Sequence, residues 1–198
     1  NLASIPNSFD TGVAGSQWTY TWYRCYALTS MPKLDFSNAG YFYGTWYECS
    51  GLTSFPDIDV TNMTGLYAAW YYCSGLTSFP NLTSGVPNVT DFTQTWYLCS
   101  GITSFPAIDC PKGTKFSQTW SNMYSLSTFP DIDVSKGERF YYTWASNTGF
   151  TSFPALSSGM PEATNVEGTW YGLNNAGFTD FPKMTFPKST TFNSCWMN

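Results

Sequence analysis

The chain of 198 residues contains no histidine, and only 11% of its residues are charged. The missing histidine excludes Ser-His-Asp triads, Cys-His pairs and histidine-based metal sites. The scarcity of charge, with a net charge of −5, leaves no basic stripe that would neutralise the phosphates of a nucleic acid. We therefore expect a non-enzymatic protein that takes no cofactor and binds no nucleic acid.

Long apolar runs are also missing. No stretch approaches the length that a membrane-spanning helix needs, and the N-terminus lacks the basic and apolar segments of a signal peptide. Serine, threonine, asparagine, glycine and tyrosine must then cover most of the surface, as is common in secreted and virion proteins. These features favour an extracellular, cell-surface or virion-surface location.

What is present is a repeat. Tryptophan returns every 24 or 26 residues, at Trp22, Trp46, Trp70, Trp96, Trp120, Trp144, Trp170 and Trp196. A phrase such as Leu52-Thr-Ser-Phe-Pro56 follows most of these tryptophans. A period of this size is typical of solenoids, in which each repeat packs only on its neighbours. We expect residues 1–198 to form a single array of eight such repeats.

Apolar residues flank each tryptophan at fixed spacings. In the third repeat Leu66 lies four residues before Trp70, and Cys73 lies three residues after it. Spacings of four and three place such residues on one face of a short helix. The Leu-Thr-Ser-Phe-Pro phrase should form a short strand that ends at the proline. The sequence therefore predicts an α/β repeat, a right-handed leucine-rich-repeat-like solenoid of eight coils, with parallel strands on one face and short helices on the other. Since helices need more room than strands, the array should curve.

The repeat also carries a family resemblance. The run Trp46-Tyr-Glu-Cys-Ser-Gly-Leu-Thr-Ser-Phe-Pro56 resembles the Cys-x-x-Leu-Thr-Ser-Leu/Ile stretch of BspA-like leucine-rich-repeat proteins, whose repeats have roughly 23–26 residues. The resemblance covers essentially the whole chain, although Phe-Pro replaces an aliphatic residue and tryptophan stands where that family often has phenylalanine. It implies a non-enzymatic adhesin or surface module, of the kind found in bacterial surface proteins and some phage-encoded proteins.

A second period lies above the first. The distance from proline to tryptophan is longer in the repeats that start at Pro6, Pro80 and Pro154, so the longer coils recur every 74 residues. Every third coil should then bulge at the same edge. Neither end shows a polar cap, although solenoids usually need one. Either the chain is part of a longer protein, or copies of it stack end to end in a fibre.

Two columns of side chains are the candidate binding surface. A tyrosine follows the tryptophan at Tyr23, Tyr47, Tyr71, Tyr97 and Tyr171. Rows of half-exposed tyrosine suit sugar stacking or protein contacts, but they also pack side by side. A threonine column follows the strand at Thr29, Thr53, Thr77, Thr103 and Thr151, and both cross-strand hydrogen bonding and ice binding explain such a column. We expect a non-catalytic structural or adhesion solenoid that displays these columns to glycans or surface proteins. The alternatives are a self-assembling fibre subunit and an ice-binding or Ca²⁺-dependent module.

Two further columns have competing interpretations. The carboxylates of Asp35, Asp59, Asp109 and Asp133 share one repeat position, where they either bind Ca²⁺ or cap turns. The thiols of Cys25, Cys49, Cys73 and Cys99 also share one position, which Met123 and Leu173 occupy in later repeats. That mixture favours free buried thiols, with disulfides between neighbouring coils as the minority alternative.

Overall fold

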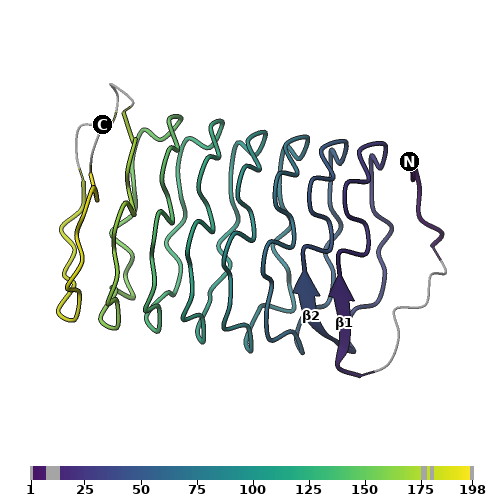
Figure 1. Ribbon diagram of the computed structural model, residues 1–198, viewed down its shortest axis with the longest axis horizontal. Helices are drawn as coiled ribbons and strands as arrows, with labels where there is room; N and C mark the ends of the chain where they lie inside the picture. The colour runs from purple at the N-terminus through teal and green to yellow at the C-terminus, as the bar shows by residue number, and fades with distance from the viewer. Residues whose placement is uncertain (1, 8–13, 175–177, 179–180, 197–198) are drawn as a thin grey trace.

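The computed structural model describes residues 2–7, 14–174, 178 and 181–196. Two parallel strands, β1 (Ser16–Thr19) and β2 (Ala39–Tyr43), pair with Gln17 opposite Tyr41. Single parallel bridges continue this ladder from coil to coil through Tyr41, Gly65, Asp91, Lys115, Arg139, Asn165 and Thr191. Figure 1 shows the resulting molecule as a row of stacked coils that runs from the N-terminus to the C-terminus.

The prediction of an α/β solenoid with short helices is wrong, because the described part of the chain contains no helix and only the two strands β1 and β2. The segment around each tryptophan is instead a series of overlapping turns. In the coil of Trp96, every second N–H donates to the next coil at 2.9–3.0 Å: Gln94 to Ser117, Trp96 to Thr119, and Leu98 to Ser121. The intervening N–H groups close turns within the coil at 3.1–3.3 Å: Thr95 to Phe92, Tyr97 to Gln94, and Cys99 to Trp96.

The spacing of the coils explains why a helix does not form. Stacked tryptophan rings of successive coils lie 5.2–6.0 Å apart between centroids, whereas packed helices need about 8–10 Å. The turn series fits this short rise, because its backbone N–H groups donate alternately to the next coil and within the coil. Its cost is a left-handed backbone two residues before and two residues after the tryptophan, with φ of 56° at Gln94 and 59° at Leu98. The array was expected to curve because helices are wider than strands. The described residues contain no helix, so this reason for curvature does not apply.

Two stacks of aromatic rings fill the core. The tryptophan rings stack along the whole array with interplanar angles of 3–15°. A parallel stack is formed by phenylalanines of the Ser-Phe-Pro phrase, at centroid distances of 5.7–6.0 Å from Phe55 to Phe181. The two stacks meet edge to face, as at Trp96 and Phe105, whose centroids lie 4.9 Å apart. Such contacts add to the hydrophobic gain of burial.

The indole N–H groups reveal how the two stacks fit together. Trp46 donates its Nε1–H to Met31 Sδ at 3.2 Å. In later coils phenylalanine takes the place of Met31, and its ring stands nearly perpendicular to the next indole, at 85° for Phe55 and Trp70. These indoles have no oxygen, nitrogen or sulfur acceptor: Trp70, Trp96, Trp120, Trp144 and Trp170. Edge-to-face packing of phenylalanine and indole takes the place of the sulfur bond in these coils.

Buried polar side chains tie each coil to the one before it. The threonine that precedes the tryptophan donates its hydroxyl to a carbonyl of the preceding coil, as from Thr119 to Phe92 at 2.8 Å. The thiol three residues after the tryptophan does the same, as from Cys73 to the carbonyl of Trp46 at 3.1 Å. Asn147 replaces the thiol in one coil and donates to the carbonyl of Trp120 at 2.7 Å. These bonds satisfy carbonyls that the turns leave open.

The two longer coils within the described residues share one bulge. Leu82 and Gly85 adopt positive φ values of 48° and 67°, and 74 residues later Leu156 and Gly159 adopt 44° and 60°. In both coils the glycine N–H donates to the leucine carbonyl, at 2.6 and 2.7 Å. The corresponding part of the first long coil lies outside the described residues.

Candidate functional site

The tyrosines that follow the tryptophans form a stacked column. Ring centroids lie 5.3 Å apart for Tyr23 and Tyr47, 4.2 Å for Tyr47 and Tyr71, and 4.9 Å for Tyr71 and Tyr97. Tyr171 stands apart from this column and meets Tyr142 at 5.7 Å with the rings tilted. The structure thus brings together four of the five predicted tyrosines.

Stacking changes what the column offers a ligand. Tyr47 and Tyr71 each have one ring above and one below, so both faces of each ring are covered by neighbours. A sugar packs on an aromatic face, and only ring edges and hydroxyls remain exposed along the middle of the column. Tyr23 and Tyr97 end the column, so each has a stacked tyrosine of the column on one face only.

A second group of tyrosines lies beside the first coils, and the sequence analysis missed it. The rings of Tyr43 and Tyr67 stack at 4.7 Å, and Tyr20 meets Tyr43 edge to face at 5.2 Å. Tyr20 also stands edge to face against Tyr23, at 5.2 Å and 83°. The signal was present, because Tyr43 and Tyr67 both lie three residues before the tryptophan and four residues before Tyr47 and Tyr71.

Crowding of these phenols raises their pKa values. Partial burial, followed by a hydrogen bond with Tyr43, raises the pKa of Tyr20 to about 12. Burial, and then the negative charge of Asp91, raises the pKa of Tyr41 to about 12. Neutral phenols are therefore favoured by the folded state more than by the unfolded chain, in which tyrosine has a pKa of about 10.

We expect the free energy of unfolding to fall as pH rises from about 10 to about 12, because the unfolded chain loses its phenolic protons first in that window. Below pH 10 this contribution is fully present. Urea unfolding followed at a series of alkaline pH values measures it. The double variant Tyr20→Phe/Tyr41→Phe should show a shallower fall, and an equally steep fall in that variant would contradict the assignment.

The predicted threonine column is exposed at all five positions, and a serine follows each of its members. The Thr53 hydroxyl donates to the Thr29 carbonyl at 3.2 Å, and the Thr151 hydroxyl donates to the Ser127 carbonyl at 3.3 Å. Backbone bonds join Thr103 to Thr77 at 3.3 Å. Five coils thus present an exposed Thr–Ser pair, and Ser127–Thr128 takes the same place in a sixth.

The aspartate column lies in turns. The Ser37 hydroxyl, and then the Ser37 N–H that donates to Asp35 at 2.9 Å, lower the pKa of the Asp35 carboxyl. Asp59 and Asp133 make the same bond to the residue two positions later, at 2.9 Å. Asp109 accepts the N–H of Asp133 at 2.8 Å. Among the described residues no group of three or more histidine, cysteine or acidic side chains is arranged to hold a metal, so the geometry favours turn capping over Ca²⁺ binding.

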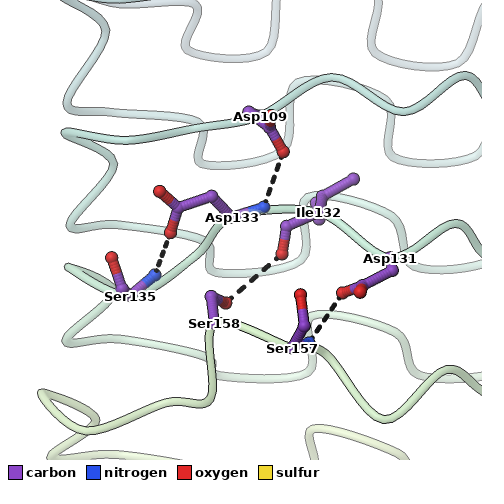
Figure 2. A pocket seen from close by; sticks show the side chains of 7 residues that line it. All are labelled: Asp109, Asp131, Ile132, Asp133, Ser135, Ser157 and Ser158. Atoms are coloured by element: carbon purple, nitrogen blue, oxygen red, sulfur yellow. Dashed lines mark hydrogen bonds between the residues drawn. The ribbon is translucent and has the colours of Figure 1, made fainter.

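The long coils create two related hollows beside these turns. One of about 410 Å³ is drawn in Figure 2, where Asp109 and Asp131 bond to backbone N–H groups and Ser158 donates to the Ile132 carbonyl. The other, of about 310 Å³, lies 74 residues earlier and includes Asp57 and Lys33. Both have polar walls whose hydrogen bonds run between neighbouring coils.

All six cysteines are free thiols, and those of the repeat position are buried except for the half-buried Cys25. Burial raises the pKa of Cys49 to about 12, and it also raises the pKa of Cys73 well above the ordinary value of a thiol. Thiols held in this form are poor nucleophiles, so the column is part of the core rather than a reactive site.

Comparison with known proteins adds no relative: no protein family, no curated protein and no solved structure matches this chain. The BspA-like resemblance therefore stays a prediction. No helix within the described residues is long and apolar enough to cross a membrane.

Proposed function

We propose that this chain is a non-catalytic structural and adhesion module of a cell or virion surface, and that it displays repeated hydroxyl groups to glycans. The observation that carries the proposal is the row of exposed Thr–Ser pairs in five coils, with Ser127–Thr128 at the same place in a sixth, joined by bonds between coils. A repeated ligand such as a polysaccharide gains from repeated contacts at a fixed spacing, because one contact raises the effective concentration for the next.

The scaffold suits display better than catalysis. Each coil is bonded to the next through the turn ladder and packed on it through the tryptophan and phenylalanine stacks. Polar surfaces built from Ser, Thr and Tyr make adaptable hydrogen bonds at low cost in side-chain entropy. The sequence has no histidine to serve as a general base near neutral pH.

The other functions considered have less support. A head-to-tail fibre is supported by the ring of Trp196 alone, which is 52% exposed. Ice binding would use the same row of threonines as the proposed glycan surface, and no separate observation favours it.

The triple variant Thr53→Val/Thr77→Val/Thr103→Val tests the proposal, because valine keeps the side-chain shape and removes only the hydroxyl. We expect binding to immobilised polysaccharides to fall at least tenfold. The matched control is Thr64→Val/Thr90→Val/Thr114→Val, which removes hydroxyls from another column whose members also bond to the preceding coil. Equal binding by the first variant and the wild type would overturn the proposal.

A further inference from the structure

One place on the tyrosine surface is shaped to receive a ligand. A hollow of about 370 Å³ is lined by Tyr20, Tyr23 and Tyr47 at the N-terminal end of the tyrosine column. Tyr20 and Tyr23 are 42% and 41% exposed, among the largest exposures of any aromatic side chain in the described residues. The volume lies at the lower end of the range for small-molecule sites, about 300–1,000 Å³.

The three rings form a corner rather than a stack. Tyr20 stands at 83° to Tyr23 and at 72° to Tyr47, while Tyr23 and Tyr47 lie within 30° of each other. Tyr23 stacks on Tyr47 alone, so one of its faces is not used by the column. Tyr97 ends the column in the same way at the other side, but no perpendicular ring stands beside it.

Polar groups border the same corner. Arg24 lies over the Tyr23 ring, with its Cζ 5.0 Å from the centroid, and donates to Glu48 at 2.8 Å. Tyr26 donates its hydroxyl to the same carboxylate at 3.1 Å. The pair of charges is internally neutralised, so the rim offers hydrogen-bond donors and acceptors without a net charge.

We propose that this corner binds one neutral pyranose ring, as the terminal contact of the glycan that the proposed function requires. The C–H groups of the sugar would pack in the hollow between the ring of Tyr20 and the Tyr23–Tyr47 pair, which together line it. The sugar hydroxyls would bond to the Tyr20 hydroxyl and to the Arg24–Glu48 pair. A cationic ligand fits less well, because Arg24 already places a positive charge over the ring.

Saturation-transfer NMR on the intact chain tests the proposal, with methyl glucoside, methyl galactoside, methyl mannoside and N-acetylglucosamine as probes. We expect at least one of these sugars to bind, and binding to weaken at least tenfold in Tyr23→Ala. Tyr97→Ala is the matched control, since it removes the other end ring and leaves the corner intact. Tyr20→Gly serves as a second variant, because the φ of 50° at Tyr20 suits glycine and removal of the ring adds no strain.

The possible outcomes separate the two proposals. Loss of sugar binding in Tyr23→Ala and Tyr20→Gly, but not in Tyr97→Ala, would support the corner. Equal binding by all variants would overturn it, and so would binding of tetramethylammonium with no sugar bound. Polysaccharide binding that depends on the Thr–Ser pairs and not on Tyr23 would overturn the corner alone. Sugar binding at Tyr23 with normal polysaccharide binding by the threonine variant would overturn only the proposed display surface.

Discussion

Replacing Trp96 by alanine is expected to lower the free energy of unfolding by about 3–5 kcal/mol, the usual cost of removing a fully buried tryptophan. Trp96 is 0% exposed and stacks between Trp70 and Trp120, at 5.9 and 5.8 Å. Its ring also meets Phe79 and Phe105 edge to face. Removal of the Trp96 ring would leave a cavity between the coils of Trp70 and Trp120, which that ring joins.

In a stacked array, a weakened interface also uncouples the coils on its two sides, because repeats contact only their neighbours. We expect Trp96→Ala to broaden urea unfolding and to raise amide hydrogen exchange most strongly near Trp70 and Trp120. Tyr97→Ala, which removes a half-buried ring at the end of its column, should cost about 1 kcal/mol and is the control. Comparable losses in the two variants would show that the indole stack does not hold the coils together.

The core columns could be predicted from the sequence, whereas the backbone that carries them could not. Spacings of four and three around the tryptophan correctly place Phe42, Trp46 and Cys49 on one buried face, each 0% exposed. Overlapping turns bring residues at these spacings to the same side as a helix does, so the pattern alone does not distinguish the two. The prediction chose the helix because it is the commoner source of this periodicity.

A signal for the turns was nonetheless present. The residue two positions before the tryptophan is Gly44 in one coil and Gly168 in another, and both have positive φ. Residues such as Leu98 conceal the pattern, because leucine rarely adopts that conformation and gives no local hint of it. At Leu98 the hydrogen bond to Ser121 of the next coil imposes the strained backbone. Contacts between coils cannot be predicted from the sequence of one repeat.

The candidate site shows the same division. The positions of the tyrosine and threonine columns follow from the repeat, and the described structure places Tyr23 and Thr53 at the surface. The loss of open ring faces along the column follows from the short rise between coils, which the expected helices would have hidden. The corner at Tyr20 depends on a residue with left-handed backbone, so no periodicity indicated it.

Two substitutions at Leu98 separate the turn ladder from a helix. Proline should cost at least about 3 kcal/mol, because it cannot adopt the φ of 59° and removes the N–H that donates to Ser121 at 3.0 Å. Glycine at the same position should leave the free energy of unfolding within about 1 kcal/mol of the wild type. Glycine relieves the strain of the left-handed backbone, and this gain offsets two losses: the burial of the leucine side chain and the greater freedom of the unfolded chain.

Urea unfolding of the two variants, measured beside Tyr97→Gly, gives the comparison. Tyr97 is not among the residues with left-handed backbone, so glycine there relieves no strain and should cost more than glycine at Leu98. In a helix the two glycines would both be unfavourable, by about 1 kcal/mol each before side-chain contacts are counted. A Leu98→Gly variant as unstable as Leu98→Pro would therefore contradict the left-handed backbone at Leu98 and its repeat equivalents, on which the coil spacing, the ring stacks and the tyrosine corner all depend.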